Sequence, residues 1–225
     1  MVPEVATRDT TPEAPSSLRT HAFGEAHELS VVDRFGIWLS LRQVLRWAGD
    51  PTGKTIGDFG AGYQARLTRA LLQRVALAYV ADVALSPEVV RHGKVKALQG
   101  SLPAILGEIP GSSLDLVFCI SVLEHVAAPE DLLRQIHRVL KPGARVLINV
   151  PSWRGKRFLE FSAFRLGLSP VAEMDDHKTY YDVRDLWPML VAAGFLPSRI
   201  RCFAHKFGLN TFAVCDKTGE VTRSG

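Results

Sequence analysis

A glycine-rich segment that contains one acid is the first part of the chain whose residue types could do chemistry. Residues 56–63 read Ile-Gly-Asp-Phe-Gly-Ala-Gly-Tyr and lie between a predicted strand and a predicted helix. Glycines at such a junction let the backbone turn tightly and approach a ligand closely. A loop that binds pyrophosphate points amide N–H groups at a dianion, and Asp58 would repel that charge. The segment therefore favours a positively charged ligand, and an ordinary strand-to-helix turn is the alternative.

A second acid, Asp82, ends the next predicted strand. An acid at this place can accept hydrogen bonds from ribose hydroxyls, although a helix cap or a turn aspartate is the alternative role. Asp82 thus supports a nucleoside without identifying it, and Asp58 favours a ligand with an ammonium group and a sulfonium. S-adenosylmethionine carries both of these groups. Nicotinamide dehydrogenases share the ribose-binding acid, and Asp58 is the feature that weighs against them.

Four segments in a fixed order carry a resemblance to a known family. They are residues 56–63, Val80–Glu88, Leu114–Val126 and Leu140–Pro151, with a weaker fifth in His177–Phe195. The chain resembles the class I S-adenosylmethionine-dependent methyltransferases, especially the small type with many small-molecule acceptors. This resemblance implies an α/β fold: a Rossmann-like three-layer sandwich whose seven-stranded, mainly parallel sheet has one antiparallel strand near the C-terminus.

The resemblance also implies which residues meet the cofactor. Asp58, Gly60 and Gly62 would line its methionine and ribose portions, and Asp82 would hold the ribose. The family usually places an aspartate against the adenine amino group, where this chain has Ser101, whose hydroxyl can accept the same bond without the charge. The remaining residues of the predicted cofactor site are Phe59, Val83, Gly100, Cys119, Ile120 and Ser121, of which the last three would border the methyl group.

Catalysis of methyl transfer depends largely on placing the acceptor in line with the methyl group. A general base is needed only if the acceptor must lose a proton. The candidates are His125, which follows Glu124, and His177 and Tyr180, which lie in a stretch that could close over the acceptor. A structural or surface role is the alternative for each. The sequence contains no ordered cluster of His, Asp and Glu that would indicate a metal site.

The leading hypothesis is methyl transfer from S-adenosylmethionine to a small molecule or biosynthetic intermediate, with S-adenosylhomocysteine as the product. One alternative is an RNA methyltransferase, which would need the basic residues between 154 and 165 to share one face. The formal charge of +4 is only a mild excess of base, so a surface of mixed sign is the simpler interpretation and nucleic acid is not the expected partner. Another alternative is a non-catalytic nucleoside-binding partner, for which Ser101 is the support.

Strands and helices alternate along the chain, as βαβ units of a parallel sheet require. Lys141-Pro142-Gly143 is predicted to stop the fourth helix, and Pro188 is predicted to kink the last one. The final two strands are close enough for an antiparallel hairpin. The predicted strands are Lys54–Phe59, Leu77–Asp82, Val95–Gln99, Leu114–Ile120, Arg145–Val150, Arg199–Phe203 and Thr211–Cys215, and the predicted helices begin near Val31, Ala65, Ser86, Pro129 and Val183.

The domain organisation follows from composition. Residues 1–20 are poor in large apolar groups, so we expect a flexible tail. Residues 21–225 should form a single domain, with 152–181 as an acceptor-side insertion or lid. Three cysteines cannot form a closed disulfide set, and no apolar stretch reaches the roughly 20 residues that span a bilayer. A cytoplasmic protein is therefore expected.

Overall fold

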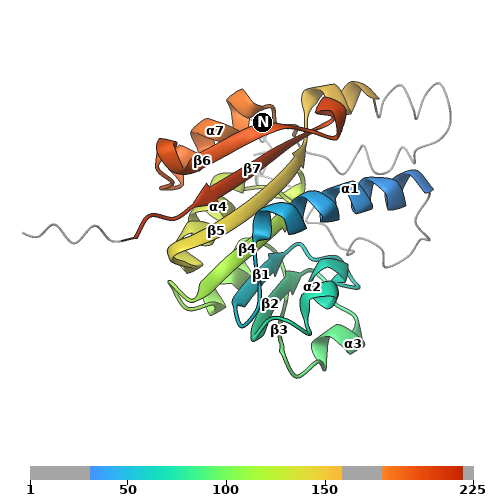
Figure 1. The fold of residues 1–225 in the computed structure, drawn as a ribbon, viewed down its shortest axis with the longest axis vertical. Helices are drawn as coiled ribbons and strands as arrows, with labels where there is room; N and C mark the ends of the chain where they lie inside the picture. Colours follow the sequence, from blue (N-terminus) through green and yellow to red (C-terminus); the bar gives the residue numbers. More distant parts are fainter. Residues whose placement is uncertain (1–30, 159–178, 220–225) are drawn as a thin grey trace, which may run out of the picture.

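A seven-stranded sheet is the centre of the molecule. The computed structural model describes residues 31–158 and 179–219. The strands follow the order β3-β2-β1-β4-β5-β7-β6 across the sheet (Figure 1). Their bounds are β1 Thr55–Phe59, β2 Leu77–Asp82, β3 Val95–Gln99, β4 Leu114–Ile120, β5 Leu140–Pro151, β6 Ile200–His205 and β7 Asn210–Asp216.

Strand β7 is the one that runs against the others. It pairs antiparallel with both β5 and β6, whereas β3, β2, β1, β4 and β5 pair in parallel. The turn η4, Lys206–Gly208, joins β6 to β7 and makes the predicted hairpin. The predicted fold class is therefore confirmed.

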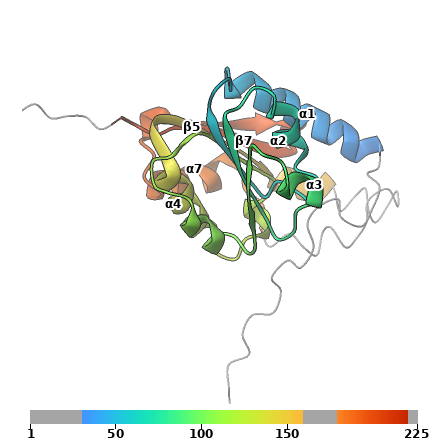
Figure 2. The same cartoon turned by 90° about the horizontal axis from the view of Figure 1, so that it is seen from below.

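Helices cover both faces of the sheet and complete the three layers (Figures 1 and 2). On one face lie α1 (Val31–Ala48), α2 (Arg66–Leu71) and α3 (Pro87–Val90). On the other lie α4 (Pro129–Val139) and α7 (Val183–Ala192). Each face has its own apolar core, because the strands are buried on both sides and alternate side chains enter each core.

Strand β5 begins earlier than the sequence predicts. Leu140, predicted as the end of the fourth helix, instead pairs with Leu114 at the start of β4. The strand then passes through Pro142 and Gly143, and its register against β4 shifts at this point. A bulge tolerates a proline that has no N–H to donate, so these residues interrupt the ladder without ending the strand. Helix α2, Arg66–Leu71, begins one residue after the predicted Ala65.

Candidate functional site

The glycine loop leaves β1 at the edge of the sheet where the parallel strands end. Gly60 and Gly62 both have a φ of 72°, in the left-handed region that favours glycine. The Gly60 N–H donates to the Ala81 carbonyl oxygen of β2 at 2.7 Å. A Cβ atom on Gly60 would lie 2.2 Å from Cγ2 of Val122, so packing as well as backbone conformation requires a glycine here.

Asp82 fixes this loop from the end of β2. Its Oδ2 accepts a hydrogen bond from the Gly62 N–H at 2.7 Å, and its Oδ1 accepts one from the Val83 N–H at 2.7 Å. The carboxylate therefore has the structural role of a turn aspartate. An ionised carboxylate offers about four lone-pair positions, so two remain that could accept hydrogen bonds from ribose hydroxyls, as predicted.

Asp58 is buried beneath the loop, within β1. Its Oδ2 accepts a hydrogen bond of 2.6 Å from the Thr68 hydroxyl of α2. Burial raises the pKa of Asp58 to about 6, and the negative charge of Asp82 acts in the same direction, while the bond from Thr68 opposes them. A cation near the loop would favour the ionised form and bring that pKa down again.

Gly100 and Ser101 lie beside Asp82, after β3. The Gly100 N–H donates to the Asp82 carbonyl oxygen at 3.0 Å. Ser101 directly follows Gly100, so it lies at the same edge of the sheet as the glycine loop, and it is partly buried. Its contact with adenine stays a prediction.

The three residues at the end of β4 differ in what they present. Cys119 is fully buried in the core under α4, and burial strongly raises the pKa of its thiol. Ile120 packs against the core on the opposite face. Ser121 is exposed at the edge, with a left-handed φ of 56°, and its N–H donates to the Asn149 carbonyl oxygen at 2.7 Å. Of the three, Ser121 is the one whose side chain lies at the surface; Phe59, like Cys119, is fully buried.

The predicted catalytic candidates are only partly described. His125 is half-buried at the end of the short helix η2, Leu123–His125. Tyr180 is buried, and its ring centroid lies 5.6 Å from that of Trp153. The next residue, Tyr181, donates from its hydroxyl to the Leu123 carbonyl oxygen at 3.4 Å, so this stretch lies against η2. His177 lies outside the described residues.

Sequence reasoning missed Asn149 and Lys206, and it named Glu124 only as the neighbour of His125. The Glu124 carboxylate is buried on η2. Asn149 is fully buried in β5, and one signal could have found it: it is the polar residue in the apolar run 146–150. Nothing in the local sequence singles out Lys206.

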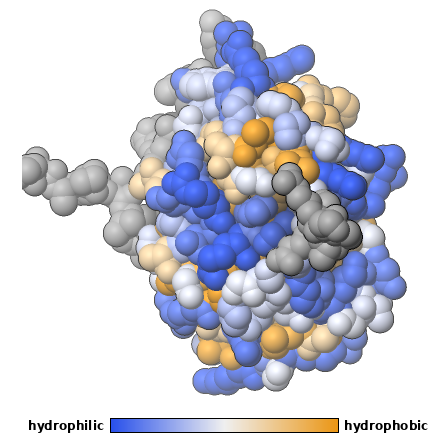
Figure 3. Space-filling view, turned by 90° about the vertical axis from the view of Figure 1, so that its left-hand side faces the viewer, coloured by the Kyte–Doolittle hydropathy of each residue, from blue (hydrophilic) through white to orange (hydrophobic). Residues whose placement is uncertain are grey.

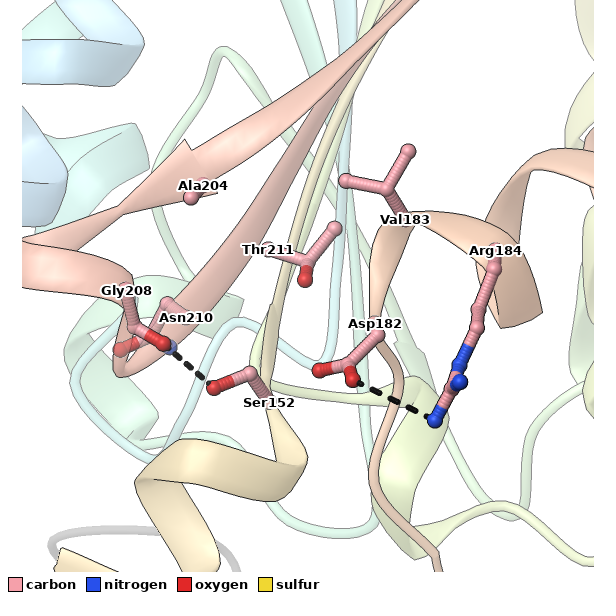
Figure 4. A pocket seen from close by; sticks show the side chains of 8 residues that line it. All are labelled: Ser152, Asp182, Val183, Arg184, Ala204, Gly208, Asn210 and Thr211. Carbon is pink, nitrogen blue, oxygen red and sulfur yellow. Dashed lines mark hydrogen bonds and ion pairs between the residues drawn. The ribbon is translucent and has the colours of Figure 1, made fainter.

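A pocket of about 460 Å³ lies between the end of β5, the start of α7 and the β6–β7 turn (Figure 4). Ser152 and Asp182 stand on its two sides, and they lie at the two ends of the predicted 152–181 insertion (Figure 4). The Ser152 hydroxyl donates to the Gly208 carbonyl oxygen at 2.7 Å. The other lining residues are Val183, Arg184, Ala204, Asn210 and Thr211.

The basic residues between 154 and 165 are only partly described. Arg154, Lys156 and Arg157 lie on one short helical stretch after β5, while Arg165 is outside the described residues. Strand β7 ends at the amino edge of the sheet, and that side is mostly hydrophilic with small, separate apolar areas (Figure 3).

In the described part of the chain, no three His, Cys, Asp or Glu residues are grouped as metal ligands. None of the helices described there has the length and apolar character needed to cross a membrane.

Known methyltransferases are similar to the chain in both sequence and structure. The family model described as "Methyltransferase domain" matches residues 57–148, the part that contains the loop and both acids. The ubiquinone biosynthesis O-methyltransferase of Pseudomonas paraeruginosa is 32% identical over 114 residues, which are 48% of each chain. Residues 57–148 of the chain thus match the class I S-adenosylmethionine-dependent methyltransferases.

The sequence match to the curated relatives covers only part of each protein's length. The mitochondrial ubiquinone biosynthesis O-methyltransferase of Schizosaccharomyces pombe is 32% identical over 121 residues, 50% of this chain and 43% of the relative. The chain thus spans about half the length of the curated relatives it matches.

Solved methyltransferases share the fold of the chain at low identity. The magnesium protoporphyrin IX methyltransferase of Synechocystis, solved with bound S-adenosylhomocysteine, has a TM-score of 0.60 at 19% identity and covers 85% of this chain and 90% of its own. A S-adenosylmethionine-dependent methyltransferase from Archaeoglobus fulgidus has a TM-score of 0.60 at 14% identity and covers 82% and 94%. These likenesses confirm the fold class.

Proposed function

We propose that this methyltransferase transfers the methyl group of S-adenosylmethionine to a small-molecule acceptor and releases S-adenosylhomocysteine. One observation carries the proposal: a left-handed glycine loop, tied down by Asp82, lies directly above the buried carboxylate of Asp58. Such a cradle suits a cationic nucleoside better than a pyrophosphate, because the acid beneath it would repel a dianion.

The site residues divide by the part of the cofactor that they would meet. The loop at Gly60 and Gly62 would hold the methionine portion close to the backbone, and at Gly60 a side chain has no room. Asp82 would accept from the ribose hydroxyls, and Ser101 would face the adenine. Ser121 would border the methyl group from the end of β4. The cofactor supplies a methyl group that is already activated by its sulfonium.

The protein's own contribution to the reaction is to position the acceptor. An oxygen acceptor is supported by the curated relatives, which are named O-methyltransferases. A hydroxyl acceptor must lose a proton, and His125 is the described candidate for a general base, because it lies on η2 just after the carboxyl end of β4.

Calorimetry with S-adenosylhomocysteine tests the cofactor site. We expect micromolar binding to the wild type, or about −8 kcal/mol, and at least tenfold weaker binding by Asp58→Ala. Asp115→Ala is the matched control, because this acid also lies on a central strand, β4, but pairs with Lys141 at 2.7 Å, away from the loop. Equal affinity in the wild type and Asp58→Ala, or preferential binding of a nicotinamide dinucleotide, would refute the assignment.

A further inference from the structure

Asn149 is a buried amide with nothing to bind among the described residues. It is 0% exposed, and neither Nδ2 nor Oδ1 has a hydrogen-bond partner in the described part of the chain. On β5 it lies between Ile120 of β4 and Phe212 of β7. Phe212 and Leu147, two residues before Asn149, belong to the α1-side core, so the amide faces α1. A buried polar group without a partner is costly and calls for an explanation.

Lys206 reaches the same face from the β6–β7 turn. Lys206 and Phe207 have left-handed φ angles of 48° and 59°, which residues other than glycine rarely adopt. This strained turn leaves Phe207 85% exposed and directs Lys206 inward. The Lys206 Nζ lies 3.7 Å from where a Cβ on Gly36 of α1 would be. A Cβ at this position would make an ordinary van der Waals contact with the ammonium, so the distance places Lys206 against α1.

Among the described residues, the Lys206 ammonium makes no direct ion pair, although the Glu124 carboxylate acts on it electrostatically. Burial lowers the pKa of Lys206 to about 8, and the Glu124 carboxylate on η2 acts in the opposite direction. An anionic group next to the ammonium would offset its burial. Two unfavourable features, the unpartnered amide of Asn149 and the strained turn at Lys206, therefore lie on the α1 side of the sheet, which is typical of a binding site.

We propose that Lys206 and Asn149 bind the methyl acceptor, and that the acceptor is a hydroxylated carboxylic acid with an apolar skeleton. This inference rests on the proposed function. The Lys206 ammonium would bind the carboxylate, and the Asn149 amide, both donor and acceptor, would bind the hydroxyl. The Asn149 carbonyl oxygen accepts a hydrogen bond from the Ser121 N–H, at the end of β4 where the methyl group is expected. Ile120 and Phe212 flank the amide with apolar surface. Because Asn149 is buried beneath α1, binding requires α1 to shift.

The test uses two probes of the same shape that differ in charge, 3-hydroxybenzoate and 3-hydroxybenzamide. Each is titrated into protein saturated with S-adenosylhomocysteine and followed by backbone amide NMR signals. The wild type and the surface control Lys141→Met should bind the hydroxybenzoate at least tenfold more tightly. Lys206→Met should remove this preference, and Asn149→Leu should weaken both probes at least fivefold. All variants should keep their affinity for S-adenosylhomocysteine within twofold.

The outcomes separate this inference from the proposed function. Failure of the wild type to bind S-adenosylhomocysteine would overturn both. Normal S-adenosylhomocysteine binding, with equal affinity for the two probes or with neither probe bound, would overturn the acceptor site alone. The midpoints of thermal unfolding of Lys206→Met and Asn149→Leu should equal or exceed that of the wild type. Lower midpoints would show that the two residues are kept for the fold, against the proposal.

Discussion

The carboxylate of Asp82 accepts a hydrogen bond from the backbone of Gly62 at 2.7 Å, and this bond joins the end of β2 to the loop that follows β1. The same carboxylate accepts from Val83, so one side chain holds both strand ends. Loop shape and ligand contact would thus depend on the same group.

Replacing Asp82 with alanine should affect stability and binding together. The N–H groups of Gly62 and Val83 would lose their acceptor, which costs roughly 1–3 kcal/mol of unfolding free energy. Affinity for S-adenosylhomocysteine should fall at least tenfold. Denaturant unfolding and calorimetry measure the two effects, with the exposed Asp131→Ala as control. Full affinity in a destabilised Asp82→Ala protein would leave the acid a purely structural role.

Gly60→Ala should destabilise the protein through both conformation and packing. The new Cβ would meet Val122 at 2.2 Å, and a left-handed φ at a non-glycine residue costs about 1–3 kcal/mol. Gly107→Ala is the control, since nothing lies within 4 Å of a Cβ there. Adding Val122→Ala should restore only part of the lost stability, because the backbone strain remains. Complete restoration in the double variant would contradict the conformational part of this argument.

Stability of the ligand-free protein should fall as the pH rises through about 6. The Asp58 carboxyl has an ordinary pKa of 3.8 and a folded pKa of about 6, so the folded state binds the extra proton between these values. The stabilisation is complete at low pH and is lost as Asp58 ionises. Since one pKa unit is about 1.4 kcal/mol, Asp58→Asn should be more stable at pH 8 by up to about 3 kcal/mol. Denaturation from pH 4 to 8 should show this slope in the wild type and not in Asp58→Asn.

Cofactor affinity should change with pH in the opposite direction. A cationic ligand needs the ionised Asp58, so the affinity for S-adenosylmethionine should rise nearly tenfold per pH unit below about 6 and level off above it. Calorimetry from pH 5 to 8 measures this, and Asp58→Asn should bind weakly at every pH. A flat profile in the wild type would place the cation away from Asp58.

His125→Gln should separate proton transfer from binding. If His125 removes the proton of a hydroxyl acceptor, kcat should fall by about 10²–10⁴ with unchanged affinity for S-adenosylhomocysteine. A weakened cofactor affinity with unchanged kcat would instead assign His125 to the shape of the pocket. The measurement is S-adenosylhomocysteine release under saturating acceptor.

Local patterns in the sequence determined most of the secondary structure. The bounds of β2, β3 and β4 agree with the prediction, because each is an apolar run that ends at a turn or helix signal. The same reasoning failed at β5, since Pro142 and Gly143 locally end an element, and their continuation into a strand depends on the pairing of Leu140 with Leu114.

The chemistry of the site was divided in the same way. The residue types and their order along the chain were enough to select the glycine loop, Asp58 and Asp82. Each of these features lies within a short stretch of sequence at the end of a predicted strand. Tertiary structure alone decided that Asp58 bonds to Thr68, that Asp82 bonds to Gly62, and that Cys119 is buried while Ser121 is exposed. It also placed Lys206 against Gly36 of α1. Such contacts join residues far apart in the chain, and burial and charge pairing at such points are properties of the packed molecule, which no short stretch of sequence contains.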